Sequence, residues 1–393
     1  MKNTYKDFLK RIYALTRFGE KMSLDGPKAL HRSLGRPLNS YPSILVAGTN
    51  GKGSTCAFLE RLLRDCGLTT GLFTSPHLNS FTERIRINGR PVDEEWLQDN
   101  SAAVLHWAER HGGSFFEAAW GLATLAFEQE TVDVAIWEVG LGGRLDATNV
   151  AKPLISCITN IALDHTRILG PRLDDIAREK SAIFKSADVC LSSATGAGLV
   201  ALKESSEWGF EEVPLLDLDV PISLPGKHQR LNASLAWAAA DAYGLAPSIA
   251  ALANTNWPGR CEYIDTFILD AAHNPAALLA LSNWVSEQGL SHLHVIFGVM
   301  EGKDYGKMAS IIESFAGTIT LVTPDYPRRI PAPALRASFT RQVDIIEPVN
   351  VALDMAPKNV KTLVCGSSFL IAEARAHLLG LEYPECGLRT LAR

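Results

Sequence analysis

Short runs of β-branched and apolar residues alternate with segments of helical spacing along most of the chain. This alternation is typical of βαβ units, in which helices connect parallel strands and cover the sheet. In the first two thirds of the sequence, strands are expected at SILVA (43–47), GLFTS (71–75), VDVAIWEV (132–139) and PLISCITNI (153–161). Helices are expected after residue 53 and over 93–111, 117–130, 173–185 and 228–243. The pattern predicts an α/β fold with a doubly wound, mostly parallel sheet.

The alternation restarts after NTNWPGRCE (254–262). Further strands are expected at TFILD (266–270), HLHVIFGV (292–299), TITLVT (318–323), QVDII (342–346) and TLVCG (362–366). Because 393 residues exceed what one hydrophobic core usually organises, two domains are expected. We predict an N-terminal P-loop domain over residues 1–256 and a smaller, Rossmann-like α/β domain over residues 257–393, joined near Trp257-Pro258-Gly259-Arg260.

Composition excludes several classes of protein. With 47% hydrophobic and 21% charged residues, the chain is an ordinary globular protein. A net charge of −5 without a clustered basic face argues against a nucleic-acid partner. No apolar run has the length of a membrane span, and MKNTYKDFLKRIY lacks the apolar core of a secretory signal. The seven cysteines form no CxxC pair, so we expect reduced thiols, no zinc site and a cytoplasmic location.

The segment VAGTNGKGST (46–55) joins an expected strand to an expected helix. A strict P-loop would have glycine in place of Val46 and a hydroxyl in place of Gly53, whereas the hydroxyl here comes one position later, at Ser54. Three glycines and a lysine at such a junction favour phosphate binding, because successive N–H groups and a helix N-terminus attract an anion. Lys52 would reach the β and γ phosphates and Ser54 would face Mg²⁺. The alternative is a tight turn with a surface lysine.

Polar residues follow other expected strands, where ligands of open α/β sheets bind. Glu138 ends an apolar strand, so its carboxylate needs a partner such as Mg²⁺ unless water reaches it. Ser75 of FTSPHL and His165 of LDHTRILG are possible metal ligands. However, Ser-Pro commonly starts a turn, and a lone histidine is more often structural. Lys180 lies in a mixed-charge helix, where a solvated lysine is the ordinary interpretation.

Taken together, these segments resemble the folylpolyglutamate synthase and dihydrofolate synthase family, a branch of the Mur ligase superfamily of ATP-dependent amide-forming enzymes. The loop of that family reads G-T-N-G-K-G-S/T, which accounts for the position of Ser54. The resemblance extends in order over nearly the whole chain, through RFGEKMSL, VAGTNGKGST, FTSPHL, ERIRING, FFEAAW, EVGLGGRLDATN, LDHTRILG, REKSAIF, LPGKHQRLNA, WPGR, DAAHNPAA and LVCGSSFLIAEA.

The resemblance implies that ATP and two Mg²⁺ ions bind this chain. The ATP phosphates would contact Asn50, Gly51, Lys52 and Gly53, and the metal ions would be held by Ser75, Glu138 and His165. In this family the lysine of the R-E-K segment is carbamylated by CO₂, which implies a carbamylated Lys180. Asn232, Arg260 and Asp270 would contact adenine, phosphate and ribose respectively. ATP would therefore bridge the two domains.

The resemblance also implies the other small-molecule substrates, dihydropteroate or a reduced folate and L-glutamate. The pterin would lie near Ser114, Phe115, Phe116 and Glu117 and near Leu145, Asp146 and Ala147, with Arg144 and Asp146 able to orient it. Glutamate would meet His273 and Ser367 or Ser368. An acyl phosphate would form first, and the glutamate amine would then attack it. His273 is the first candidate for the base that deprotonates this amine, and Asp270 is the second.

Two features depart from the family pattern. The segment between Lys185 and LPGKHQ is shorter than expected, and GVMEGKDY has Gly302 where an acidic residue is usual. Two other functions stay open. A peptidoglycan-precursor ligase of the same superfamily would more often carry a separate N-terminal domain, which we do not expect before a loop that begins at residue 48. A P-loop nucleotide-binding protein without ligase activity would not need Lys180. We expect a monomer that contacts no membrane.

Overall fold

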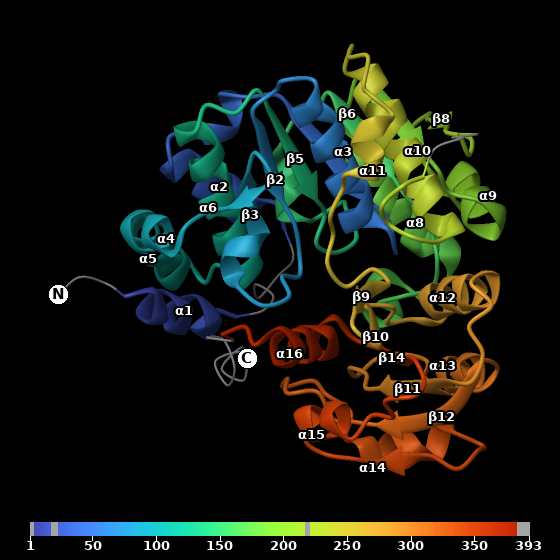
Figure 1. Ribbon diagram of the computed structural model, residues 1–393. Coiled ribbons are helices and arrows are strands. Elements are labelled where there is room, and N and C mark those ends of the chain that lie inside the picture. Colours follow the sequence, from blue (N-terminus) through green and yellow to red (C-terminus); the bar gives the residue numbers. More distant parts are fainter. Residues whose placement is uncertain (1–3, 17–22, 217–220, 383–393) are drawn as a thin grey trace.

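The computed structural model describes residues 4–16, 23–216 and 221–382. Most of the RFGEKMSL match (residues 17–22) therefore lies outside the described residues. The chain forms two α/β lobes, each built around its own sheet, and Figure 1 shows the two lobes stacked one above the other. This architecture confirms the predicted fold class. The predicted boundary at residue 257 falls between the last helix of the first lobe and the first strand of the second lobe.

The sheet of the first lobe has the strand order β4-β3-β2-β5-β1-β6-β7-β8. Its central pairs are parallel, and only β2–β3 and β3–β4 are antiparallel. The strands are β1 Ser43–Ala47, β2 Thr70–Phe73, β3 Ile85–Ile87, β4 Arg90–Pro91, β5 Val134–Glu138, β6 Ile155–Ile158, β7 Val189–Ser192 and β8 Glu211–Glu212. The four strands predicted for this lobe are confirmed as β1, β2, β5 and β6.

Helices cover both faces of this sheet, which explains why the central strands are continuous apolar runs. Successive residues of β1 illustrate this, because Leu45 packs into the core on one face and Ile44 and Val46 pack into the core on the other. The helices are α1 Tyr5–Ala14, α2 Asp25–Ser33, α3 Lys52–Asp65, α4 Glu94–Asn100, α5 Ala102–His111, α6 Phe115–Gln129, α7 Thr166–Leu169, α8 Leu173–Ser181, α9 Gly196–Ser205, α10 Lys227–Ala242 and α11 Ala250–Ala253.

Two predicted helices differ from the structure. The segment expected as one helix over 93–111 divides at Ser101 into α4 and α5. The segment expected over 173–185 ends its α-helical part at Ser181 and continues as a 3₁₀ turn over Ala182–Ser186. Both segments keep a helical pattern of apolar residues, and that pattern does not distinguish a continuous helix from two consecutive ones.

The sheet of the second lobe has the strand order β13-β12-β11-β14-β10-β9, and only β9–β10 is antiparallel. The strands are β9 Glu262–Ile264, β10 Phe267–Asp270, β11 Leu293–Phe297, β12 Ala316–Leu321, β13 Asp344–Ile345 and β14 Thr362–Cys365. The helices are α12 Pro275–Glu287, α13 Tyr305–Glu313, α14 Ala332–Leu335, α15 Val349–Asp354 and α16 Ser368–Leu379. All five strands predicted here are confirmed, and the antiparallel edge strand β9 is an addition.

Helix α16 brings the second lobe against the first lobe, and Figure 1 shows it beside β10 and β14, below the first lobe. The Asn79 amide donates to the Ala372 carbonyl at 2.9 Å, and Arg375 Nη1 donates to Asn79 Oδ1 at 3.2 Å. On α10 and α12, Lys227 and Glu287 form an ion pair of 2.9 Å. Within the described ranges, none of the helices has the length and apolar composition of a membrane span.

Candidate active site

A cavity of about 910 Å³ lies between the lobes, beyond the carboxyl ends of the central strands of both sheets. We call it the interlobe cavity. All of the residues predicted to bind nucleotide, metal and substrates except Arg144 line it: Asn50, Gly51, Lys52, Gly53, Ser54, Ser75, Ser114, Phe115, Phe116, Glu117, Glu138, Leu145, Asp146, Ala147, His165, Lys180, Asn232, Arg260, Asp270, His273, Ser367 and Ser368. The structure thus brings side chains from distant parts of the sequence to one place.

The phosphate loop, residues 48–54, connects β1 to α3 and is tightly packed. Gly51 has φ 86°, and a Cβ atom there would lie 2.3 Å from Asn232 Oδ1. A Cβ atom on Gly48 would lie 1.8 Å from Thr159 Oγ1. Both positions therefore require glycine. Lys52 Nζ donates to the carbonyl oxygens of Gly48 and Thr49 at 3.1 and 3.2 Å, so its ammonium group lies over the loop.

The hydroxyl of Ser54 provides a test of whether a nucleotide and a metal fit this loop. It is buried in the wall of the interlobe cavity and makes no hydrogen bond with any described residue. A buried hydroxyl without a partner is costly, so such a group in a cavity wall indicates a missing ligand. A phosphate oxygen or a hydrated Mg²⁺ ion supplies that partner. The chemistry of Lys52 and Ser54 therefore fits a nucleoside triphosphate with its divalent cation.

The residues predicted to hold metal are a hydroxyl, a carboxylate and an imidazole. Glu138 is buried and accepts a hydrogen bond from the backbone N–H of Ser75 at 2.8 Å. Burial raises the pKa of Glu138, and the nearby charge of Lys52 opposes this effect. The His165 side chain is 42% exposed, and partial desolvation together with the nearby charge of Lys303 lowers the pKa of its imidazole, whose neutral form binds metal. Among the described residues, no three His, Cys, Asp or Glu side chains cluster as a metal site. Glu138 and Ser75 offer oxygen ligands of the kind that Mg²⁺ prefers, and Mg²⁺ usually keeps several water ligands besides.

Lys180 is not the solvated lysine that its mixed-charge helix suggests. Its side chain is buried, and Nζ donates to the Gly48 carbonyl at 2.9 Å. Burial, together with the charge of Lys52, lowers the pKa of Lys180 to about 7. Near neutral pH a substantial fraction of the amine is therefore uncharged and nucleophilic.

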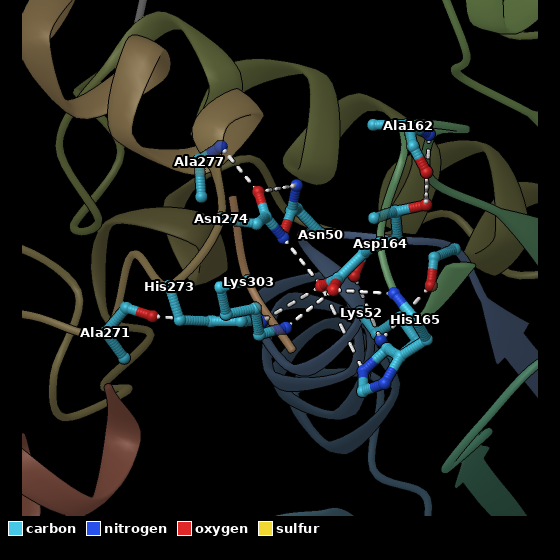
Figure 2. Close-up of polar contacts among 12 residues, drawn as sticks. Asn50, Lys52, Ala162, Asp164, His165, Ala271, His273, Asn274, Ala277 and Lys303 are labelled. Atoms are coloured by element: carbon cyan, nitrogen blue, oxygen red, sulfur yellow. Dashed lines mark hydrogen bonds and ion pairs between the residues drawn. The ribbon is translucent and has the colours of Figure 1, made fainter. Parts of the chain in front are cut away.

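A polar network joins the phosphate loop to the second lobe, as Figure 2 shows. Asn50 and Asn274 exchange two amide hydrogen bonds of 3.2 and 2.9 Å. Asn274 also donates to Asp164 at 2.9 Å. Lys303 Nζ donates to the same carboxylate at 2.6 Å, and His273 Nε2 lies 3.6 Å from it. Asp164 therefore binds three residues of the opposite lobe.

The charges in this network stabilise the ionised form of Asp164. Burial raises the pKa of the Asp164 carboxyl, but the neighbouring imidazole of His273 and the charge of Lys303 outweigh burial and hold the pKa well below its usual range. Neither Lys303 nor Asn274 was predicted from the sequence. For Asn274 a signal was available, because an asparagine before Pro275 is a typical helix N-cap, and its side chain does accept from Ala277 N at 2.9 Å.

The Lys303→Met variant is expected to weaken the contact between the lobes by about 3 kcal/mol, because removing one partner leaves a buried charge uncompensated. The side chains of Lys303 and Asp164 are only 10% and 5% exposed, so solvent screens this pair little. Small-angle X-ray scattering should show a larger radius of gyration. The exposed Lys307, which pairs with Asp304 on the surface, provides the control variant Lys307→Met. An unchanged scattering profile for Lys303→Met would contradict a closing role for the ion pair.

The three residues predicted to contact adenine, phosphate and ribose lie near the junction of the lobes. Asn232 donates to Gln229 Oε1 at 2.9 Å, and Arg260 donates to the carbonyl of Gly259 at 2.9 Å. The Asp270 carboxylate accepts from the backbone N–H groups of Cys261 and Ala272 at 2.9 and 2.8 Å. Asp270 thus fixes the end of β10 against the junction. Its contact with ribose and its role as the second candidate base stay predictions.

The start of α6 forms an aromatic end of the interlobe cavity. Ser114 and Glu117 form a capping box that fixes this helix start. The Phe115 ring stacks on Tyr13 with centroids 5.3 Å apart, and the Arg84 guanidinium carbon lies 5.0 Å from the Phe115 centroid. His77 connects Tyr13 and Arg84 through hydrogen bonds of 3.2 and 2.7 Å. This Tyr13-His77-Arg84 chain was not predicted from the sequence, because its members lie up to 71 residues apart.

The two polar residues proposed to orient a pterin are both engaged within the protein. The Asp146 carboxylate accepts hydrogen bonds from the backbone N–H groups of Gly140, Leu141 and Thr148 and from the Thr148 hydroxyl. Arg144 forms an ion pair with Glu179 at 2.8 Å, is largely exposed and does not line the interlobe cavity. Asp146 therefore shapes the loop over residues 140–148, and a direct contact of either side chain with a pterin stays a prediction.

Comparison with known proteins identifies the class first. The Mur ligase middle domain matches residues 46–192, and the glutamate ligase domain of Mur ligases matches residues 259–368. The two lobes and the cavity between them are therefore those of a Mur-type ligase. The dihydrofolate synthase/folylpolyglutamate synthase of Bacillus subtilis is 31% identical over 430 residues, covering 96% of this chain and 100% of that protein. The chain belongs to the dihydrofolate synthase/folylpolyglutamate synthase family.

Two solved structures support this assignment. Escherichia coli FolC in complex with DHPP and ADP superimposes with a TM-score of 0.85 and 28% identity, covering 96% of this chain and 98% of that chain. The bifunctional folylpolyglutamate synthase/dihydrofolate synthase of Yersinia pestis, complexed with AMPPNP and Mn ion, superimposes with a TM-score of 0.80 and 28% identity. The match covers 91% of this chain and 94% of that chain. The chain spans about half the length of the first curated relatives it matches, which are probable bifunctional folylpolyglutamate synthase/dihydropteroate synthases.

Proposed function

We propose that this chain is an ATP-dependent ligase that adds L-glutamate to dihydropteroate, a reduced folate or both through an acyl phosphate. The observation that supports this proposal most directly is that one cavity combines the phosphate loop, the buried Lys180 and the second-lobe residues bound to Asp164. The DHPP and ADP of the E. coli relative and the AMPPNP and Mn ion of the Y. pestis relative support the substrates and the divalent cation. The monomeric state and the cytoplasmic location stay predictions.

In the first step, the carboxylate of the pterin substrate attacks the γ-phosphate of ATP. Lys52 reduces the repulsion between these two anions, and the backbone N–H groups of the phosphate loop orient the phosphates. Mg²⁺ bound by Ser75, Glu138 and His165 would supply further positive charge. The network around Asp164 holds the second lobe against the phosphate loop and so excludes water from the acyl phosphate.

In the second step, the amine of L-glutamate attacks the acyl carbon, phosphate leaves and an amide remains. The amine must first lose a proton. His273 Nδ1 lies 2.9 Å from the Ala271 carbonyl, so Nδ1 carries the hydrogen and Nε2 is left to accept a proton. Asp164, 3.6 Å from Nε2, would stabilise the imidazolium that results. This geometry supports His273 as the base.

We also propose that Lys180 carries a carbamate. The neutral amine attacks CO₂, an N–C bond forms and Nζ loses a proton, which replaces a cation by an anion. The lowered pKa of Lys180 supports this step, because only the uncharged amine reacts. The resulting carboxylate would lie close to the phosphate loop, where it would offset the positive charge of Lys52 and of bound Mg²⁺.

Release of ADP from ATP is expected to depend on both a pteroate substrate and L-glutamate. A coupled assay with each substrate omitted in turn measures this dependence. ADP release with a muramyl nucleotide in place of the pteroate would instead indicate a peptidoglycan-precursor ligase. Nucleotide binding without turnover on either substrate would contradict ligase activity.

A further inference from the structure

The side chain of Asn160 pairs with both backbone polar groups of Asn50 in the phosphate loop. Asn160 Oδ1 accepts from the Asn50 N–H at 3.0 Å, and Asn160 Nδ2 donates to the Asn50 carbonyl at 3.1 Å. Because a backbone N–H only donates and a carbonyl only accepts, these contacts fix which end of the carboxamide faces each group. Asn160 therefore holds Asn50 at two points, which neither an ionised aspartate nor an apolar side chain can do.

The sheet places Asn160 beside the phosphate loop. Strand β6 pairs parallel to β1, so the residues that follow β6 run alongside those that follow β1. Thr49 N donates to the Asn160 carbonyl at 3.0 Å, and the Thr159 hydroxyl donates to the Asn50 carbonyl at 2.6 Å. The end of β6 thus sets the conformation of the loop up to Asn50.

The side chain of Asn50 is bound to the other lobe. Its carboxamide exchanges two hydrogen bonds with Asn274, at 3.2 and 2.9 Å, as Figure 2 shows. Asn274 also donates to Asp164 and accepts from Ala277 N at the start of α12. Asn50 is therefore held by the first lobe through its backbone and by the second lobe through its side chain. Rotation of the Asn50 peptide would move its carboxamide away from Asn274.

We propose that Asn160 is a positioning residue of the ligase reaction and acts through Asn50. This inference rests on the proposed function. By fixing the Asn50 peptide, Asn160 directs the Asn50 carboxamide to Asn274 and so aligns the second lobe with the loop that would bind the ATP phosphates. Because the Asn50 N–H is engaged by Asn160, the phosphates would meet the N–H groups of the first turn of α3, which have no intrahelical partner.

The Asn160→Ala variant is expected to lower kcat/KM for ATP by roughly ten- to thirty-fold, the effect of losing two neutral hydrogen bonds. Asn274→Ala should lower it at least as much. In the double variant the two factors should not multiply, because both substitutions remove the same alignment of Asn50, and the loss should stay within about three-fold of the larger single loss. A coupled ADP-release assay measures all three variants.

The matched control is Asn100→Ala, which should keep the wild-type kcat/KM. The Asn100 carboxamide also donates and accepts within the protein, but it does not line the interlobe cavity. The dissociation constant of a non-hydrolysable ATP analogue, measured by calorimetry, provides a second readout of the same cycle that needs no turnover. The losses in affinity should likewise fail to multiply.

Single losses that multiply in the double variant, in either measurement, would overturn the proposal. So would a folded Asn160→Ala with wild-type kcat/KM and affinity, which would leave Asn160 a role in folding alone. If Asn160→Ala fails to fold, the near-isosteric Asn160→Asp replaces it in the cycle, with the same two outcomes. A wild type without glutamate-dependent ADP release would contradict the proposed function, whereas the cycle of dissociation constants would still test Asn160.

Discussion

The Lys52→Ala variant is expected to lose ATP-dependent product formation, with kcat at least about a hundred- to a thousand-fold below that of the wild type. The reason is electrostatic, because two anions must approach each other in the first step and Lys52 is the cation of the phosphate loop. Its Nζ lies over that loop, within 3.2 Å of the Gly48 and Thr49 carbonyl oxygens. A coupled ADP-release assay measures the loss.

The control is Lys203→Ala, since Lys203 lies on α9, pairs with Glu212 and does not line the interlobe cavity. It should retain wild-type turnover. Thermal unfolding of both variants would verify that Lys52→Ala is folded. Turnover of Lys52→Ala within a few-fold of the wild type would show that the reaction occurs away from the phosphate loop.

The Lys180→Ala variant is expected to lose most of its activity and to regain part of it in high acetate or in bicarbonate-rich buffer, if a small carboxylate can replace the carbamate. In the wild type, the carbamate should increase between pH 6 and 8, because the lowered pKa of about 7 makes the neutral amine predominate above that pH. Carbon-13 NMR of protein equilibrated with ¹³C-bicarbonate detects the modified lysine directly.

Free CO₂ also falls as pH rises, so the NMR titration should be made at constant dissolved CO₂. Lys203→Ala again provides the control and should keep both the carbamate signal and the activity. Unchanged activity of Lys180→Ala in plain buffer would contradict the proposed modification. So would a carbon-13 NMR spectrum of Lys180→Ala identical to that of the wild type.

The sequence predicts the parts of the fold that depend on local pattern. The strand β1 is a run of five buried residues between two covered faces, and such a run has few other interpretations. The strand β8, Glu211–Glu212, has only two residues, both exposed, and carries no such pattern. The strand β9 pairs antiparallel at an edge, where one face needs no apolar residues. Elements of this kind are defined by their partners and were not predicted.

The candidate site likewise has parts that a local sequence pattern predicts and parts that depend on tertiary contacts. The phosphate loop could be predicted because its chemistry lies within seven consecutive residues. The burial of Lys180 could not, because it results from the packing of α8 beside Gly48, which is 132 residues away. The pairing of Lys303 with Asp164 spans 139 residues and two lobes. Contacts between residues so far apart in the sequence depend on how the chain packs and how the lobes meet. Patterns within a single sequence do not indicate this packing.

The most direct test of the account is a crystal structure with a non-hydrolysable ATP analogue and Mn²⁺. The account predicts a triphosphate over Gly51 and Lys52 with anomalous peaks beside Ser75, Glu138 and His165, and the second lobe closed by the contacts of Asp164. A nucleotide bound outside the interlobe cavity, or Mn²⁺ held by residues elsewhere in the chain, would contradict it.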